Sequence, residues 1–448
     1  MKLRDYQAID AVFLAQTMTS ACFNEQRTGK TPTALAMVKL KKVQKVVIIC
    51  PGSAVYIWKE EYEKWLNQPC VALVGTPKKR QELLETWTHG LVVSYDTFKQ
   101  TLNSKGMVDA ILAMKPEFII ADEAHRFKTP KSAVANAIFK TTCIPHRLAL
   151  TGTPAPGKAH EIYSILHWLF PHRFPSYWKF VAEYFYQDRK FGSGGRQYIE
   201  ILGFKKEKQI ELQEFLNQVS TQRKRIEVMP WLKPKNIVPV LLPCTKYQEK
   251  YLKELLDYFE TEHIVTQGVL DRLMRYRQIC LDPGLLNLKG TSPKTDWIIE
   301  YIKDYPEKSV IIFSKFTSYI KRLSNTLITY DINNHMIIGE TPLQQRKDNV
   351  TDFQKGKYKV LLLNIDAGKE ALTLDKAEVA IFTDKYPPIG TIEQAEDRFV
   401  ATTEDKKDKE TTIYDLIMKN TYDENIHEML IQRKTETDLI NDFKRHCK

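Results

Sequence analysis

The segment Thr28-Gly29-Lys30-Thr31 has the residue types needed to hold the phosphates of a nucleotide. A glycine lets the backbone approach a phosphate closely, a lysine offers a point charge to the β and γ phosphates, and a threonine hydroxyl can ligate Mg²⁺. A helical pattern follows directly, so the positive end of a helix would face the same anion. The match to the phosphate-loop pattern is incomplete, because Asn24 stands where the first glycine is usual. So short a pattern also occurs by chance, and a second signal is needed.

The acidic segment Asp122-Glu123-Ala124-His125 is that second signal. It follows an apolar run and lies within one domain's length of Lys30. In metal-assisted hydrolysis one carboxylate holds Mg²⁺ while another orients or deprotonates the attacking water, and we expect Asp122 and Glu123 in these roles. A lone acidic pair is more often a solvated turn. The order of the two segments and the strand before the second favour a nucleotide site.

Short apolar, β-branched runs recur in the first and last thirds of the chain, each followed by turn residues and a helical pattern. These runs are 46–50, 91–95, 118–125, 147–154, 309–316, 359–364 and 377–384. Continuous apolar strands that alternate with helices predict parallel sheets covered on both faces, with ligands at the carboxyl ends of the strands. We therefore expect an α/β fold with two parallel-sheet domains and a cleft between them. The predicted limits are 1–168 for an ATP-binding domain, 169–235 for a basic insertion and linker, and 236–448 for a second domain with a helical insertion near 245–290.

The composition is that of a globular protein, with 448 residues, 43% hydrophobic and 27% charged. No apolar run is long enough for a membrane span, the first residues lack the apolar stretch of a signal peptide, and the seven cysteines form no C-x-x-C pair. We expect a reducing, cytoplasmic compartment. The net charge of +11 suits a polyanionic partner such as nucleic acid, although many basic proteins bind none.

Further motifs follow one another in a fixed order along the chain. They are Leu3-Arg4-Asp5-Tyr6-Gln7, Cys50-Pro51-Gly52-Ser53, Trp58-Lys59-Glu60-Glu61, Leu150-Thr151-Gly152-Thr153-Pro154, Ile312-Phe313-Ser314-Lys315-Phe316-Thr317, and Gln394-Ala395 with Asp397-Arg398. Together with the two segments above, they resemble the motifs of superfamily 2 helicases and translocases, and among these the Swi/Snf-like family. The resemblance covers nearly the whole chain and implies two RecA-like domains that use ATP and Mg²⁺ and bind DNA.

The resemblance also implies a role for each matching residue. ATP would be bound by Gln7, which reads the adenine, and by Thr28, Gly29, Lys30, Thr31 and Gln394. DNA would be contacted by Pro51, Ser53, Ser94 and Ser314. Hydrolysis would be coupled to motion by His125, Thr151 and Thr153. Catalysis would depend on Lys30, Asp122, Glu123 and Arg398, with Mg²⁺ held by Thr31 and Asp122.

The chain departs from the family pattern at three places. Arg27 stands where the phosphate loop usually has a glycine, and Ala401 stands where the last motif usually has a second arginine. The loop 364–370 has one glycine where two are usual. The second arginine commonly serves as the finger on the γ phosphate, so Arg398 would have to replace it. These departures predict an altered rate of hydrolysis.

Residues 186–208 have the pattern of a β-hairpin, with a Gly-Ser-Gly-Gly turn between two strand-like arms. Arg189, Lys190 and Arg196 put positive charge along it. We expect these side chains to contact a DNA junction, so that the hairpin acts as a wedge. The alternative is a solvent-exposed hairpin without a role.

The function expected from these features is that of an ATP-dependent DNA helicase or translocase. The compact form resembles phage helicases of the UvsW type, which implies fork regression and branch migration in recombination or replication. The expected partners are branched or forked duplexes and single strands, without a membrane and with the protein as a monomer. The alternative is a non-catalytic, nucleotide-gated DNA-binding subunit, which Arg27 and Ala401 motivate.

Overall fold

The computed structural model describes residues 2–102, 105–156, 158–191, 197–257, 264–366, 374–400, 410–434 and 436–447. The chain divides into two compact units, Met1–Pro230 and Trp231–Lys448. Each unit is built on one large parallel sheet, so the predicted α/β fold with two parallel-sheet domains is confirmed. The domain limits predicted at 168 and 235 stay predictions.

The first unit contains a seven-stranded sheet in which every neighbouring pair of strands is parallel. In sheet order its strands are β11 (Ser220–Thr221), β1 (Thr19–Cys22), β8 (His146–Leu150), β7 (Phe118–Asp122), β2 (Val46–Cys50), β4 (Gly90–Ser94) and β3 (Cys70–Ala72). All residues of β2 are buried, as continuous apolar runs in parallel sheets require. The four early apolar runs are the strands β2, β4, β7 and β8, as predicted.

Helices connect these strands. They are α1 (Asp5–Ala15), α2 (Lys30–Lys41), α3 (Val55–Leu66), α4 (Pro77–Glu85), α5 (Tyr95–Phe98), α6 (Met107–Ala113), α7 (Ala133–Phe139) and α8 (Tyr163–Leu169), with short 3₁₀ turns η1 (Gly52–Ala54), η2 (Ala124–Phe127), η3 (Lys140–Cys143) and η4 (Ala159–Ile162). Phe127 and Trp168 pack edge to face with ring centroids 5.7 Å apart. This contact fixes the turn that follows the acidic segment against α8.

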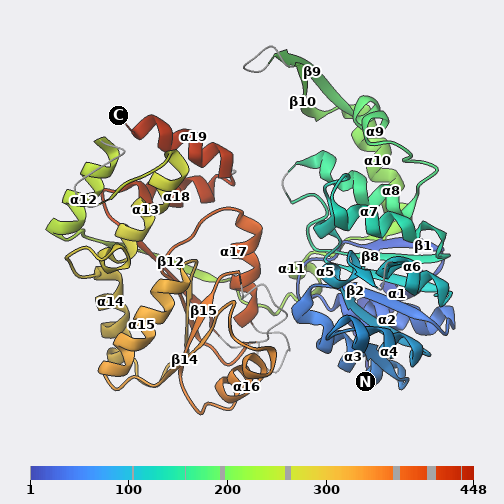
Figure 1. Ribbon diagram of the computed structural model, residues 1–448, viewed down its shortest axis with the longest axis horizontal. Coiled ribbons are helices and arrows are strands. Elements are labelled where there is room, and N and C mark those ends of the chain that lie inside the picture. Colours follow the sequence, from blue (N-terminus) through green and yellow to red (C-terminus); the bar gives the residue numbers. More distant parts are fainter. Residues whose placement is uncertain are drawn as a thin grey trace. The chain divides into compact units, whose positions relative to one another are not determined.

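The first unit contains a β-hairpin between α9 (Tyr177–Tyr184) and α10 (Lys206–Val219), at the segment 186–208 where a hairpin was predicted. Its strands, β9 (Phe185–Phe191) and β10 (Gln197–Phe204), are antiparallel. A short helix, α11 (Arg225–Val228), follows β11. In Figure 1 the hairpin projects away from the sheet of this unit. Phe180 and Tyr184 of α9 are buried in a local aromatic core.

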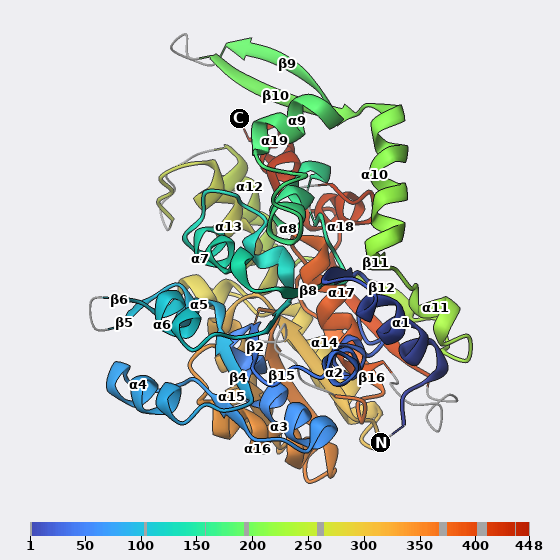
Figure 2. The ribbon, with the colours of Figure 1, turned by 90° about the vertical axis from the view of Figure 1, so that its right-hand side faces the viewer.

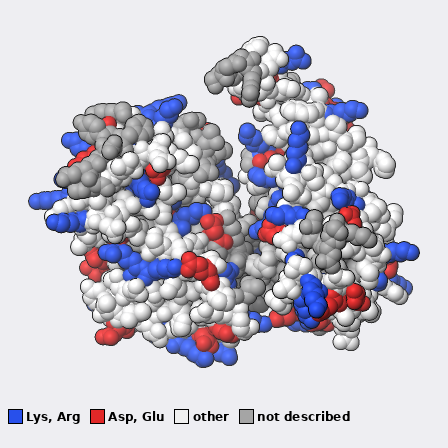
Figure 3. Space-filling model, viewed as in Figure 1, with Lys and Arg blue, Asp and Glu red and all other residues white. Residues whose placement is uncertain are grey.

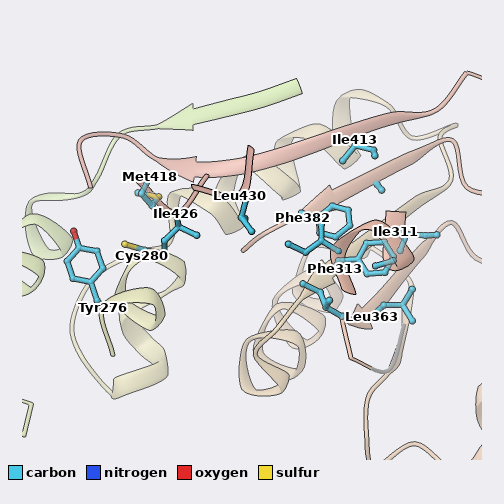
Figure 4. Packing of buried hydrophobic residues seen from close by; sticks show 14 of the residues in the cluster. Tyr276, Cys280, Ile311, Phe313, Leu363, Phe382, Ile413, Met418, Ile426 and Leu430 are labelled. Carbon is cyan, nitrogen blue, oxygen red and sulfur yellow. The ribbon is translucent and has the colours of Figure 1, made fainter. Parts of the chain in front are cut away.

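The second unit contains a six-stranded sheet, also parallel throughout. In sheet order its strands are β12 (Asn236–Leu242), β17 (Thr412–Met418), β16 (Val379–Phe382), β13 (Val310–Ser314), β15 (Val360–Asn364) and β14 (Asn334–Ile337). The late apolar runs are β13, β15 and β16, as predicted. Phe313 and Phe382 stack on one face of this sheet, 4.7 Å between centroids, within the core drawn in Figure 4.

The helices of the second unit include two that lie in the region 245–290, where a helical insertion was predicted. They are α12 (Lys246–Asp257), α13 (Val269–Leu281), α14 (Pro293–Asp304), α15 (Thr317–Thr329), α16 (Leu343–Gln354), α17 (Ile389–Glu396), α18 (Tyr422–Ile431) and α19 (Glu436–His446), with 3₁₀ turns η5 (Pro283–Leu286) and η7 (Asp397–Phe399). Among the described residues, no helix is long and apolar enough to cross a membrane.

Candidate functional site

The phosphate loop joins the carboxyl end of β1 to the first residue of α2. Its last residue, Gly29, has φ +79°, a left-handed conformation that side chains rarely adopt. A Cβ atom at Gly29 would lie 2.1 Å from Nε2 of Gln7. Glycine is therefore required at this position for two reasons: the backbone conformation is left-handed, and Gln7 occupies the space that a side chain would need.

Lys30 points back over the loop that precedes it. Its Nζ donates to the carbonyl oxygens of Asn24 at 3.1 Å and Glu25 at 3.2 Å. These partners are neutral carbonyl oxygens, so Lys30 can still pair with an anion. Lys30 also acts electrostatically on Asp122, where its charge opposes a rise in the pKa. The two predicted catalytic groups therefore lie near each other at the carboxyl edge of the sheet.

Gln7, the residue expected to read adenine, is buried and ties α1 to the phosphate loop. Its Nε2 donates to the carbonyl oxygen of Thr28 at 3.1 Å, and its Oε1 accepts from the main-chain N–H of Arg4 at 3.0 Å. The Tyr6 hydroxyl donates to the same Thr28 oxygen at 2.7 Å. The structure thus places Gln7 against the loop, and its contact with a base stays a prediction.

Asp122 ends β7, and three groups fix its orientation. The indole Nε1 of Trp58 donates to Oδ2 at 2.8 Å, the main-chain N–H of Glu123 donates to Oδ1 at 3.0 Å, and the Tyr95 hydroxyl donates to the Asp122 carbonyl at 2.8 Å. Burial and the charge of Glu123 raise the pKa of Asp122 to about 6, against the opposing effects of Trp58 and Lys30. The carboxylate is therefore held in place while its two oxygens stay available as ligands.

Glu123, His125 and Thr151 form a polar cluster beside Asp122. Nδ1 of His125 lies 3.0 Å from Oγ1 of Thr151 and 3.3 Å from Oε2 of Glu123. Burial and the charge of Arg126 lower the pKa of His125 to about 4, so the imidazole is neutral near pH 7. Among the described residues Oε2 of Glu123 is buried without a hydrogen-bond partner. The Glu123 carboxylate thus lies within reach of His125 at the carboxyl edge of the sheet.

The predicted coupling residues share this cluster. The Thr151 side chain is buried, and its Oγ1 accepts from the main-chain N–H of Thr153 at 3.1 Å. Thr151 directly follows β8, so the contact with His125 links the ends of two neighbouring strands, β7 and β8. The structure therefore brings His125, Thr151 and Thr153 together, while their role in coupling stays a prediction.

The donor set at this edge fits a magnesium nucleotide. Thr31 lies in the first turn of α2 and Asp122 at the end of β7, so oxygen atoms alone are offered, as Mg²⁺ prefers. Among the described residues no three His, Cys, Asp or Glu side chains form a group that could hold a metal ion. In nucleotide sites Mg²⁺ usually shares its coordination with the phosphates.

The predicted DNA contacts of the first unit lie on the loops after β2 and β4. Pro51 and Ser53 lie at the turn η1, and Ser94 begins α5, where its Oγ accepts from the N–H of Thr97 at 3.1 Å. A Cβ on Gly52 would lie 4.0 Å from that of Ser94, so the two loops adjoin. All three side chains are partly exposed.

Ser314, expected to contact DNA from the second unit, is buried. Its hydroxyl donates to Oδ1 of Asp384 at 2.7 Å. Asp384 also accepts from the main-chain N–H of Lys315 at 3.1 Å and from Nη2 of Arg277 at 3.1 Å. Asp384 thus organises the carboxyl end of β13, a role that neither its spacing nor a motif indicated. A contact of Ser314 with DNA stays a prediction.

Gln394 lies in α17 and Arg398 in the following turn η7, both half-buried in the second unit. The turn is anchored by Lys235, whose Nζ lies 2.7 Å from Asp397 and 3.2 Å from Glu396. Ala401, and the loop after Asp366 that carries the third departure, lie outside the described residues. Arg196 of the hairpin lies outside them too.

The described part of the hairpin carries Arg189 and Lys190 on opposite faces of β9. Lys190 forms an ion pair with Glu200 on β10. Arg189 is exposed and lies opposite Ile199. Among the described residues it has no ion pair. The apolar side chains of Phe191 and Leu202 are also exposed, at 70% and 61%. Basic and apolar groups are therefore both presented to solvent on the projecting strands.

Sequence reasoning missed the groups that brace the phosphate loop. Asp10 of α1 is buried and accepts from Nδ2 of Asn24 at 2.8 Å and from Nη2 of Arg223 at 2.8 Å. No periodicity relates Asp10 to Arg223, which are 213 positions apart in the chain. Arg27, where glycine is usual, has φ +64°, so the chain adopts there the conformation that favours glycine.

Comparisons with known proteins agree with this arrangement. A family model described as the SNF2-related domain matches residues 15–285, and one described as the Helicase conserved C-terminal domain matches residues 293–400. The DNA annealing helicase and endonuclease ZRANB3 of Bos taurus is 24% identical over 414 residues, which are 89% of this chain and 37% of that protein. An uncharacterized ATP-dependent helicase of Mycoplasma pneumoniae is 24% identical over 421 residues, 89% of this chain and 38% of that protein. The chain thus spans less than half the length of these curated relatives.

Among solved structures, the Sulfolobus solfataricus SWI2/SNF2 ATPase core in complex with dsDNA is 20% identical. The match covers 96% of this chain and 91% of that one, with a TM-score of 0.42.

Proposed function

Because the chain belongs to the SNF2-related family, we propose that it is an ATP-dependent DNA translocase or helicase. The observation that carries the proposal is the group at the carboxyl edge of the first sheet. There Lys30 acts on the carboxylate of Asp122, and the buried Oε2 of Glu123 has no hydrogen-bond partner among the described residues. A cation, an oriented carboxylate that can hold Mg²⁺ and a second carboxylate that can orient water are parts that hydrolysis of a phosphoanhydride uses.

In this proposal each residue has one task. Lys30 and the N–H groups at the start of α2 bind the phosphates of ATP, and Thr31 with Asp122 holds Mg²⁺. The bound ion neutralises charge on the β and γ phosphates. Glu123 orients the attacking water and takes its proton. The neutral His125 contacts both Glu123 and Thr151, so a change in the protonation of Glu123 is transmitted to Thr151. Arg398 stabilises negative charge in the transition state.

We further propose that the substrate is branched or forked DNA and that the hairpin separates strands at the junction. The support is the exposed Arg189 together with the exposed apolar side chains of Phe191 and Leu202 on a projecting hairpin. A basic and apolar surface can contact both phosphates and unstacked bases. The relative named as a DNA annealing helicase is compatible with such a substrate. Fork regression and branch migration of the UvsW type belong to this proposal.

DNA binding is expected to depend on local contacts. Figure 3 shows that Lys and Arg side chains of the described residues are interspersed with Asp and Glu on the visible face and form no continuous basic field. Affinity should nevertheless fall as salt rises, because phosphate contacts release counterions.

The alternative function is a non-catalytic subunit in which nucleotide controls DNA binding. The observation that favours it is Arg27, whose φ of +64° is strained for a residue other than glycine. A strained loop could bind nucleotide without orienting it for attack. This alternative predicts nucleotide binding without turnover.

DNA-stimulated ATPase activity separates the two functions. We expect wild-type protein to hydrolyse ATP on forked DNA, and Lys30→Ala and Glu123→Gln to lose turnover by about 10²-fold or more. Glu123→Gln should still bind ATP, because the amide keeps the shape of the side chain. Lys39→Ala is the matched control, since Lys39 is an exposed lysine of the same helix. If wild-type protein hydrolyses ATP no faster than Glu123→Gln with any DNA, the translocase function is wrong and the non-catalytic subunit is the remaining function.

A further inference from the structure

Residues 220–225 run alongside the phosphate loop, although they follow it only after the hairpin. β11 pairs in parallel with β1, with Ser220 opposite Ala21 and Thr221 opposite Cys22. The pairing continues beyond the strands. The N–H of Phe23 donates to Thr221 O at 2.8 Å, and the N–H of Glu25 donates to Arg223 O at 3.0 Å. The returning chain therefore covers one side of the loop for its first half.

Side chains reinforce this pairing at a buried carboxylate. Asp10 of α1 is 0% exposed. Its Oδ1 accepts from Nε and Nη2 of Arg223 at 3.1 and 2.8 Å, and its Oδ2 accepts from Nδ2 of Asn24 at 2.8 Å. Three segments of the chain thus meet at one carboxylate: helix α1, the phosphate loop and residues 220–225.

The ion pair with Arg223 offsets the free-energy cost of burying the Asp10 carboxylate. A buried carboxylate without a partner is strongly disfavoured, and Arg223 supplies both the opposite charge and two N–H donors to the same oxygen, Oδ1. If Arg223 were lost, Asp10 would be left with the neutral amide of Asn24 alone among the contacts described here. The bond between Asp10 and Asn24 would remain, but it would join Asn24 to a buried carboxylate that has lost its charged partner.

Asn24 passes this constraint to Lys30. The carbonyl oxygen of Asn24 accepts from the Lys30 ammonium at 3.1 Å, so the place of this residue helps to decide where the ammonium points. At the other end of the loop Gln7 holds the carbonyl of Thr28. Gln7 and Asp10 are three positions apart in α1 and therefore lie on one face of the helix. The loop is held at both ends by α1 and along its first half by residues 220–225.

We propose that Arg223 is a positioning residue for the phosphate loop, which it orders through Asp10 and Asn24 before any nucleotide binds. The ordering of the loop does not depend on the proposed ATP site. Only its consequence, tighter nucleotide binding, rests on the proposed function. Figure 2 shows that helix α10 runs from the base of the hairpin to β11. Arg223 therefore stands where the chain re-enters the sheet after its longest excursion in the first unit.

Amide hydrogen exchange of the nucleotide-free protein tests the proposal directly. In Arg223→Ala we expect the amides of residues 23–30 to exchange at least about tenfold faster than in wild type, because charge-assisted bonds are lost. Asp10→Asn, which removes the ion pair but keeps the shape, should show the same change. Unchanged exchange of residues 23–30 in both variants would overturn the proposal.

Arg173→Ala is the matched control for a merely structural effect. Arg173 belongs to the same unit, is 43% exposed against 38% for Arg223, pairs with Glu211 at 3.5 Å and lies 3.9 Å from the ring centre of Phe215. Its loss should lower thermal stability without accelerating exchange at residues 23–30. Acceleration in Arg173→Ala equal to that in Arg223→Ala would show that the effect is general loosening.

Binding of a fluorescent ADP analogue gives the second readout. We expect the affinity of Arg223→Ala to fall about tenfold and that of Arg223→Lys to fall less, because lysine keeps the charge but loses the fork. Arg223→Lys also serves if the alanine variant does not fold. A wild-type protein that binds no nucleotide would overturn the proposed function alone, since hydrogen exchange still decides the role of Arg223.

Discussion

Trp58 and Asp122 are joined by a hydrogen bond of 2.8 Å from the indole Nε1 to Oδ2. Trp58 belongs to α3, which begins directly after the turn that carries Pro51 and Ser53. The same rigid helix therefore contacts the candidate magnesium ligand at one side chain and adjoins the predicted DNA contacts at its start. This relationship was not expected from the sequence, in which Trp58 was only the first residue of the motif Trp58-Lys59-Glu60-Glu61.

The value of this bond can be measured by replacing the indole. Trp58→Phe should lower the free energy of unfolding by about 1 kcal/mol more than Trp87→Phe, because a bond to a carboxylate is stronger than one to a carbonyl. Trp87 is the matched control: both side chains are 2% exposed, and Trp87 donates to the carbonyl of His89 at 3.0 Å. Urea unfolding of both variants gives the comparison. Equal losses would mean that the bond of Trp58 to Asp122 contributes no more than the bond of Trp87 to a neutral carbonyl.

Gly29 offers a sharper test of the phosphate loop. Gly29→Ala should destabilise the protein by about 2–5 kcal/mol, since the new Cβ meets Gln7 and the left-handed backbone is strained. Nucleotide binding should be lost with it. Gly203→Ala is the control, because a Cβ there meets no atom within 4 Å and the backbone has no positive φ. A stable Gly29→Ala variant that binds nucleotide normally would contradict the loop geometry.

The two described basic residues of the hairpin should differ in their effect on DNA binding. Arg189→Ala should weaken binding to forked DNA and lower the slope of log affinity against log salt by about 1. Lys190→Ala should have the smaller effect, because Lys190 is already paired with Glu200. Fluorescence anisotropy at several salt concentrations gives both slopes. Should Lys190→Ala have the larger effect, the ion pair must open on binding and the hairpin contacts DNA with its other face.

Cysteine labelling should follow burial and the pKa of each thiol. Cys143 is exposed, whereas Cys22, Cys50, Cys70 and Cys280 are buried. Burial raises the pKa of Cys70 to about 12, and a raised pKa means less thiolate at any given pH. At pH 8 a thiol reagent should therefore modify Cys143 quickly and Cys70 only after unfolding. Peptide mapping after brief labelling identifies the sites, and rapid native labelling of Cys70 would contradict the packing of β3.

The fold could be predicted because each of its central strands is encoded by one short, contiguous run of residues. Runs such as 46–50 and 118–121 are apolar throughout, which is how a strand buried on both faces must look. The segment around Lys30 could be predicted for the same reason, since the loop, the charge and the helix are contiguous. The burial of Ser314 could not, because it depends on Asp384, a residue of another strand's end.

The bracing of the phosphate loop lay beyond sequence reasoning on similar grounds. Asp10 reads as one more polar residue of an amphipathic helix, and Arg223 as one basic residue in a basic stretch. Only the fold brings them together, and a buried ion pair leaves no mark on periodicity or composition. Long-range polar pairs are therefore the part of a site that a structure adds to a sequence.

The pairing of β11 with β1 also has a consequence for the folding of the protein during its synthesis on the ribosome. β1 carries the phosphate loop, and without β11 it would be the open edge of the sheet, with Asp10 buried beside it and Arg223 not yet made. Everything else in that sheet is synthesised earlier. The nucleotide site therefore cannot be finished until residues 220–225 have left the ribosomal tunnel, and until then the nascent chain presents an unprotected strand to its neighbours.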